Sequence, residues 1–221
     1  MATKKNEVVE IKAPEFIEVP IRIVGDSPLM VHNWTEKEKK KMLDNAMGLN
    51  KGKKKEPKDP VYEYINSFYW IEGKPKEDTM EAFEDAIMNG AKFGVKAISI
   101  KSAAVSAAYR KGWSKDKVSL RSEFWILSGE DGLLEIKGDA PIMREDPVTV
   151  GISGSDLRYR GEFRNWHIDF ILKYDKNGTY PIDALINMIN LGGFACGIGE
   201  WRVEKGGDFG MYHVESIDKK K

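Results

Sequence analysis

The stretch LGGFACGIGEWRVEKGGDFGMYHV, residues 191–214, holds seven glycines in twenty-four residues. Glycine is costly to order, so it gathers where the backbone takes a positive φ or passes close to another group. Trp201, Arg202, Lys205 and Phe209 stand between the glycines. Free amide groups, cations and aromatic rings together suit a chain of phosphates and bases. The alternative is a glycine-rich turn between a helix and a last strand, with both aromatic rings in the core.

The composition around this stretch is that of a soluble globular protein. The chain has 221 residues, of which 41% are hydrophobic and 32% charged, with 35 basic and 35 acidic side chains. This length predicts a single domain over residues 16–217, preceded by a flexible polar arm over residues 1–15. One cysteine excludes an internal disulfide and favours a reducing compartment. No apolar run is long enough to span a membrane and the N-terminus has no signal-peptide pattern, so we expect a cytoplasmic protein without a membrane partner.

Hydrophobic periodicity outward from the glycine-rich stretch predicts both strands and helices. Strands are expected at 16–24, 67–71, 123–127, 133–136, 148–150, 156–163, 166–174 and 210–217. Helices are expected at 35–47, 78–90, 101–111 and 181–191. A short helical turn is expected between residue 61 and the strand at 67–71, and a short extended segment is expected before the helix at 101–111. Thr35 and Glu38 fit a capping box, and Pro20 predicts an edge position or a bulge in the first strand. The lack of strict alternation between strands and helices favours an α+β fold with an antiparallel sheet.

Lysines are concentrated after the first expected helix. Residues 37–58 hold nine lysines against three acidic residues, and residues 48–60 have no apolar periodicity. This pattern predicts a basic inserted loop that adds nonspecific affinity for nucleic acid through Lys51, Lys53, Lys54 and Lys55. A solvated lysine loop without any partner is the alternative.

The segment DLRYRGEF, residues 156–163, places two arginines two residues apart. In a strand, Arg158 and Arg160 project to one face while Tyr159 projects to the other. Two arginines on one face form a phosphate-binding row, unless carboxylate partners neutralise them. Lys101 and Arg110 add cations near the ends of the alanine-rich helix.

The motifs of several enzyme classes are absent. The three histidines, His32, His167 and His213, show no metal-ligand spacing, so we expect no metal site and no cofactor. A P-loop, a nucleophile elbow and a dinucleotide fingerprint are also missing. A metal-independent RNA-cleaving enzyme would have to use His32 or His213. We therefore favour a protein that is not an enzyme.

Three segments together resemble the RAMP superfamily, whose members form the backbone of CRISPR effector complexes. They are VPIRIVGDSPLMVHN at 19–33, AISIKSAAVSAAYRK at 97–111 and GIGEWRVEKGGDFGMYHV at 197–214. They are similar, in order, to the first strand with its Ser-Pro-Leu turn, to a small-residue helix ending near an arginine, and to a glycine-rich loop before the last strand. The chain departs from the pattern in the Trp-Arg-Val-Glu-Lys insert within that loop. It also resembles an uncharacterised family from bacteriophages and prophages, in which RYRGEF and the ending GEWR recur.

This resemblance implies a ferredoxin-like, RRM-related antiparallel sheet with helices on one face and long inserted loops. It also implies single-stranded RNA or DNA on the sheet and loops, in a bacterial host cell, with subunits assembling side by side as a homo-oligomer or filament. A structural phage protein that self-assembles through the glycine loop, and an endoribonuclease of the same fold, are the alternatives. We expect bases to stack on Trp34, Tyr159 and Trp201. The expected nucleic-acid-binding residues are Lys51, Lys53, Lys54, Lys55, Lys101, Arg110, Arg158, Arg160, Gly197, Gly199, Trp201, Arg202, Lys205, Gly206 and Gly207.

Overall fold

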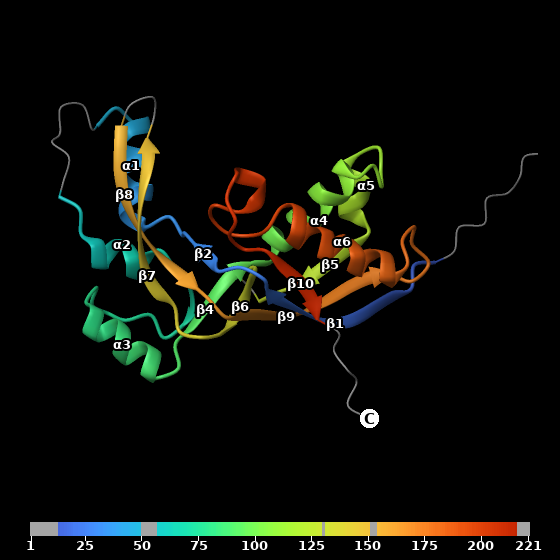
Figure 1. Ribbon diagram of the computed structural model, residues 1–221, viewed down its shortest axis with the longest axis horizontal. Helices are drawn as coiled ribbons and strands as arrows, with labels where there is room; N and C mark the ends of the chain where they lie inside the picture. Colours follow the sequence, from blue (N-terminus) through green and yellow to red (C-terminus); the bar gives the residue numbers. More distant parts are fainter. Residues whose placement is uncertain (1–12, 50–56, 130, 151–153, 216–221) are drawn as a thin grey trace, which may run out of the picture.

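A seven-stranded antiparallel sheet forms the larger part of the protein (Figure 1). The computed structural model describes residues 13–49, 57–129, 131–150 and 154–215. In sheet order, the strands are β10 (Tyr212–Glu215), β1 (Phe16–Gly25), β9 (Trp166–Asp175), β6 (Leu133–Gly138), β4 (Lys92–Lys96) and β3 (Tyr69–Glu72), and β5 (Phe124–Leu127) also pairs with β9. The sheet therefore places the first and the last strand of the described residues side by side, because β1 pairs with β10 as well as with β9.

Alternating apolar residues explain why β9 lies at the centre of this sheet. Trp166, Ile168, Phe170 and Leu172 are buried on one face, and the residues between them are partly exposed on the other. Pro20 lies in the part of β1 that pairs with β9. This part extends beyond the residues of β1 that pair with β10, so the missing N–H group of Pro20 removes no hydrogen bond to β10.

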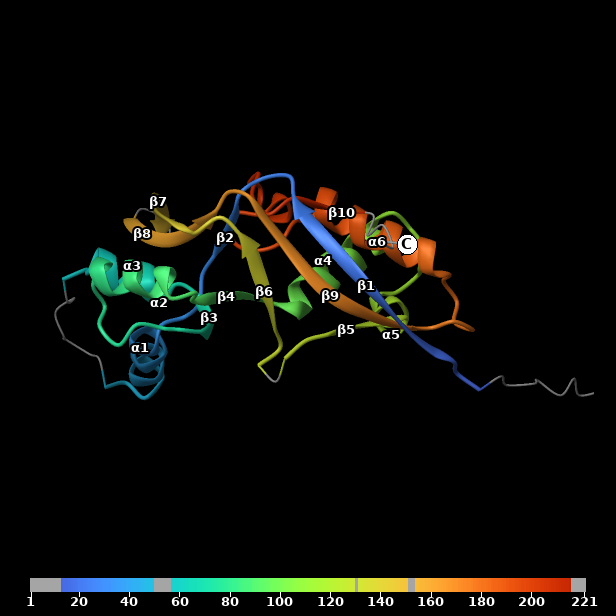
Figure 2. The same cartoon turned by 90° about the horizontal axis from the view of Figure 1, so that it is seen from below.

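Two long helices cover the buried face of the large sheet (Figure 2). The helices of the described residues are α1 (Glu36–Ala46), α2 (Pro60–Asn66), α3 (Met80–Met88), α4 (Ala97–Arg110), α5 (Lys117–Ser122), α6 (Ile182–Ala195) and the short 3-10 helix η1 (Val203–Lys205). α4 and α6 pack against each other at Gly192, where a Cβ atom would lie 2.6 Å from the backbone nitrogen of Ala104. Glycine at this position thus serves helix packing rather than ligand binding.

A second, three-stranded sheet lies beside α1, α2 and α3 (Figure 1). Its strands, in sheet order, are β2 (Leu29–Val31), β8 (Gly154–Phe163) and β7 (Ile142–Val150). One face packs on an aromatic cluster around Phe68, whose ring centroid lies 5.9 Å from that of Phe163 and 4.7 Å from that of Phe93. The cluster joins the small sheet to β4 of the large sheet.

Most of the expected elements are confirmed, and the α+β class with them. The capping box at the start of α1 is present, since Glu38 N donates to Thr35 Oγ1 at 3.1 Å and Thr35 N donates to Glu38 Oε2 at 2.8 Å. Two boundaries were wrong: α4 begins at Ala97 rather than at residue 101, and β7 begins at Ile142 rather than at residue 148. Among the described elements, β2, α5 and the short helix η1 were not predicted from the sequence.

The predicted N-terminal arm falls mainly outside the described residues. Of its last residues, Glu15 is tied to the end of β9, because its backbone N–H group donates to Asp175 Oδ1 at 2.9 Å. None of the helices in the described ranges is long and apolar enough to cross a membrane.

Candidate functional site

The glycine-rich loop, residues 196–211, folds back on itself against the segment that leads into β2. Gly210 N donates to Pro28 O at 2.8 Å, and Glu200 N donates to Met30 O at 2.9 Å. Gly199 makes this contact feasible: its φ is +78°, and a Cβ atom would lie 2.2 Å from Met30 O. The loop is therefore docked on the small sheet as well as on α6.

Trp201 occupies the most unusual backbone position in the loop. Its φ of 47° makes it the one residue other than glycine with a positive φ in the described part of the chain. Bulky residues are rarely found there, and such strain occurs at functional sites more often than elsewhere. The half-buried indole lies 6.3 Å from the Phe209 ring and faces the guanidinium of Arg160, whose central carbon is 5.4 Å from its centroid.

The strand β8 carries Arg158 and Arg160 on the same face, as the alternation of residues predicts. In the register of β7 and β8, Arg158 stands opposite Asp146 and Arg160 stands opposite Arg144. We call this surface of the small sheet, which carries Arg144, Arg158 and Arg160, the arginine face. Tyr159 alternates with the arginines and belongs to the opposite face, so it does not stand beside them.

Arg160 is buried and poorly partnered. Only 2% of its surface is exposed, and its nearest carboxylate oxygen, on Glu200, lies 3.9 Å from Nη1. Its Nε and Nη1 groups have no hydrogen-bond partner among the described residues. Burial lowers the pKa of this guanidinium, against the opposing effects of the carboxylates of Glu200 and Asp146. Arg158 is half-exposed and forms no ion pair with another described residue.

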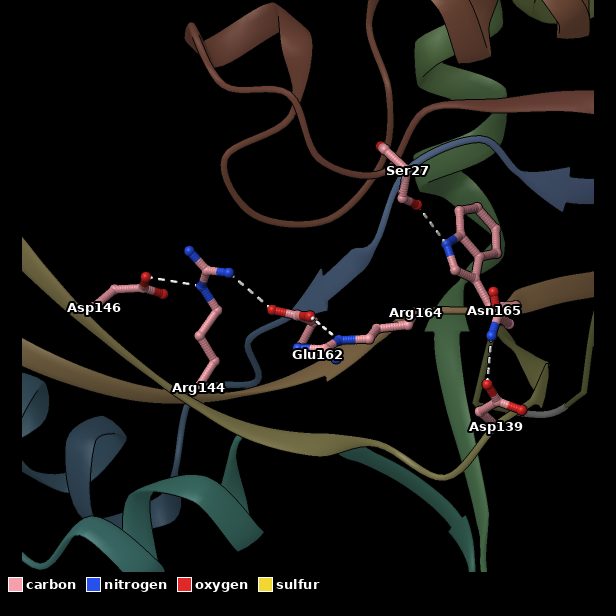
Figure 3. Close-up of polar contacts among 8 residues, drawn as sticks. Ser27, Asp139, Arg144, Asp146, Glu162, Arg164 and Asn165 are labelled. Carbon is pink, nitrogen blue, oxygen red and sulfur yellow. Dashed lines mark hydrogen bonds and ion pairs between the residues drawn. The ribbon is translucent and has the colours of Figure 1, made fainter.

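Arg144 is neutralised by the carboxylates of two neighbouring residues (Figure 3). Its guanidinium donates to Asp146 at 2.8 Å and to Glu162 at 2.9 Å, and Glu162 also accepts from Arg164 at 2.9 Å. Burial alone would raise the pKa of Glu162, but the two arginines lower it. The Arg144 guanidinium also lies 4.9 Å from the Phe209 ring centroid, so this network of charges contacts the glycine-rich loop.

Sequence reasoning did not identify Arg144, Asp146 or Glu162 as one network. The strand β7 was predicted only from residue 148, so its pairing with β8 was not recognised. A charged run that contains Pro147 gives no strand signal. Pro147 is compatible with the pairing of β7 and β8 because β7 is an edge strand, where proline is tolerated.

His32 directly follows β2 and lies between two cavities. One cavity, of about 210 Å³, separates α4 from the glycine-rich loop, and the other, of about 190 Å³, separates α1 from β8. Both ring nitrogens are buried and have no hydrogen-bond partner within the described ranges. Burial lowers the pKa of this imidazole, so it is neutral at pH 7. The Trp34 ring, 47% exposed, packs edge-on against it at 5.9 Å.

His213 stands apart from His32. It lies on β10 in the large sheet, where its Nδ1 is 2.6 Å from Asp26 Oδ1 and its side chain is half-exposed. The two histidines proposed for an enzyme therefore lie beside different sheets, because His32 follows β2 and His213 lies on β10.

The cations of the glycine-rich loop are only partly free. Arg202 pairs with Glu204 at 3.1 Å, and Arg110 at the end of α4 pairs with the same carboxylate. Burial would raise the pKa of Glu204, but these two arginines lower it. Lys205 is exposed, next to Gly206, whose φ of +80° is left-handed. Gly197 has a φ of +67°, and at Gly207 a Cβ atom would lie 1.8 Å from Trp201 O.

Other predicted residues lie elsewhere. Lys101 is buried beside Trp125, with Nζ 4.8 Å from a ring centroid of that indole, and burial lowers its pKa. It is absent from the lining of the cavity between α4 and the glycine-rich loop, to which α4 contributes Ser99, Ser102, Ala103 and Ser106. The four predicted loop lysines, Lys51, Lys53, Lys54 and Lys55, lie outside the described residues.

The structure thus brings Arg158, Arg160, Trp201, Arg202 and Trp34 around the junction of the small sheet and the glycine-rich loop. No group of three or more potential metal ligands occurs in the part of the chain that the structure describes. A comparison with known protein families finds no match, and a comparison with curated proteins finds none either.

Proposed function

We propose that the chain binds single-stranded nucleic acid at the junction of the arginine face and the glycine-rich loop. One observation carries the proposal: Arg160 is buried beneath Trp201, and two of its N–H groups lack an acceptor among the described residues. Unpaired buried donors are expensive and rare in native proteins. An acceptor supplied by a ligand, such as a phosphate oxygen, would offset this cost when Trp201 moves aside.

The neighbouring residues fit the same ligand. Arg158 and Lys205 offer partly or fully exposed charge for further phosphates. Trp34 and Trp201 offer aromatic faces on which bases stack, each stack contributing about 1–3 kcal/mol. Arg202 shares its carboxylate with Arg110 and therefore has a smaller role than the sequence alone indicates.

For the fold, we propose a ferredoxin-like core of the RAMP type. The supporting observation is the strand order β10-β1-β9-β5, with α4 between β1 and β5 in sequence and α6 between β9 and β10. This order is similar to the βαββαβ arrangement of ferredoxin-like domains, which supports the proposal. The small sheet, α1, α2 and α3 are then insertions into that core, between β1 and β4 and between β6 and β9. By the same resemblance, subunits of a phage-encoded protein would line up side by side along the strand.

Trp201→Ala tests the proposed function. We expect a loss of affinity for single-stranded oligonucleotides of about ten- to a hundredfold, because one stacking platform is lost. Fluorescence anisotropy at low salt measures the affinity, and thermal unfolding measures the stability of the same sample. The half-buried position of Trp201 predicts a modest loss of stability.

Trp125→Ala is the matched control, because Trp125 is 61% exposed on β5, outside the proposed site. Equal affinities of the two variants would contradict the proposal. A shortened probe would instead favour the endoribonuclease alternative, for which His32→Ala is the deciding variant.

A further inference from the structure

The cavity between α4 and the glycine-rich loop has apolar walls and a polar row. Val95, Ala103 and Ile198 contribute apolar surface. Ser99, Ser102 and Ser106 follow one another at helical spacing along the side of α4 that lines the cavity. Ser102 is exposed and forms no hydrogen bond with another described residue, so its hydroxyl group is available at the mouth of the cavity.

His32 lines the same cavity, and its imidazole carries two unsatisfied groups among the described residues. Its ring nitrogens are buried without partners in the described part of the chain. A neutral imidazole presents one donor and one acceptor. The Tyr69 hydroxyl group, whose ring also lines the cavity, donates to His32 O at 3.2 Å and so fixes the position of the histidine backbone.

The charges around the cavity balance. Lys96 and Arg202 are opposed by Glu200 and Glu204. Such a lining does not favour an anion, so a phosphate group is a poor occupant. The volume of about 210 Å³ is also below the roughly 300 Å³ at which pockets for drug-sized ligands begin. A neutral, planar ring with hydrogen-bonding edges fits both the size and the chemistry.

We infer that this cavity accepts one unstacked nucleobase of the bound strand. The inference rests on the proposed function and adds a base-reading step to it. The backbone lies on the arginine face, one base turns across the glycine-rich loop into the cavity, and His32 with Ser102 contacts its edge. Protein sites that read single strands commonly hold a splayed base between apolar or aromatic groups while its edge is hydrogen-bonded.

Ser102→Met tests this inference by filling the mouth of the cavity from an exposed helix position. Affinity is measured for a short single-stranded oligonucleotide and for a chain of the same length that carries abasic sites only. We expect the variant to bind the oligonucleotide about tenfold more weakly than the wild type does, and to bind the abasic chain equally well. Ser122→Met, an exposed serine at the end of α5, is the control and should change neither affinity.

Photo-crosslinking gives a second measurement that does not depend on the variant. An oligonucleotide that contains 4-thiouracil is irradiated with the wild-type protein, and the crosslinked peptides are identified by mass spectrometry. Crosslinks to Tyr69 or to the residues of α4 that line the cavity, Ser99, Ser102, Ala103 and Ser106, support the inference.

The outcomes separate the two claims. If the wild type binds and Ser102→Met weakens both probes equally or neither, or if crosslinks occur only near Trp34 and Trp201, the base pocket is wrong while the binding function stands. If the wild type binds neither probe at low salt, both claims fail.

Discussion

Charged side chains lie in different environments on the large sheet and on the small sheet. On the large sheet, α4 and α6 cover an apolar face, and the other face carries surface ion pairs such as Arg22 with Asp169 at 2.6 Å. On the small sheet, the arginine face lies beneath the glycine-rich loop, and the part of the chain that the structure describes gives the buried Arg160 no full set of partners.

The distribution of unsatisfied polar atoms makes the same distinction. Among the described residues, the buried side-chain atoms that lack a hydrogen bond belong to His32, Asp146, Arg160 and Tyr212. Only Tyr212 belongs to the large sheet. The others border the glycine-rich loop or the small sheet, as expected where a ligand completes the hydrogen bonding. The large sheet thus provides stability, and the small sheet carries the features that stability alone does not explain.

Leu172→Ala should have the largest effect on folding, because it breaks the apolar core of the large sheet. Leu172 is fully buried on β9, so the change should lower the free energy of unfolding by about 2–5 kcal/mol. Urea denaturation measures this loss. The folded fraction of the variant should still bind oligonucleotides with the affinity of the wild type. A loss of binding larger than the unfolded fraction explains would contradict the assignment of stability to the large sheet and of binding to the small sheet.

Arg160→Met should do the reverse. A methionine fills similar space without the unpaired donors, so the free energy of unfolding should stay the same or rise. Affinity for single strands should fall at least tenfold, because a charged hydrogen bond contributes about 1.5–3 kcal/mol. Binding isotherms measure the affinity, and urea denaturation of the same preparation measures the free energy of unfolding. A strongly destabilised variant would instead identify Arg160 as a structural residue of the small sheet.

Asp169→Asn should have the smallest effect, on the exposed face of the large sheet. Hydrogen bonds from Arg22 hold the pKa of Asp169 at about 2, assisted by Lys137 and against the effect of burial. A carboxylate with a lowered pKa stabilises the fold above its unfolded pKa of about 3.9, and this stabilisation disappears as the pH falls through about 2.

The variant should therefore lose about 1 kcal/mol or less at neutral pH, because the pair is partly exposed. Its stability should meet that of the wild type near pH 2. Urea denaturation at a series of pH values tests this, and a difference that grows toward low pH would refute the assignment.

Local patterns in the sequence were sufficient for much of the fold. Alternation predicted β8 and β9, and the Thr35 capping box predicted the start of α1. The start of α4 was missed because Lys96 at its N-cap makes no capping hydrogen bond through its side chain, so the sequence carries no start signal there.

The site was less predictable because it depends on distant contacts. Alternation along β8 correctly placed Arg158 and Arg160 on one face. It could not reveal that Trp201, far along the chain, covers Arg160, or that Arg144 stands opposite it. Likewise, the glycine pattern did not separate Gly192, which serves helix packing, from Gly199, which lets the loop approach Met30.

The most direct test of the account is the salt dependence of single-strand binding by Arg158→Glu and Arg121→Glu. Both variants change the net charge equally. Arg158 lies on the arginine face, whereas Arg121 is exposed on α5, which is not part of that face. Each phosphate contact contributes about −0.7 to the slope of log affinity against log salt. We predict that Arg158→Glu weakens binding and flattens the slope, whereas Arg121→Glu leaves the slope as in the wild type. Equal slopes for the two variants, or no binding by the wild type at low salt, would contradict the account.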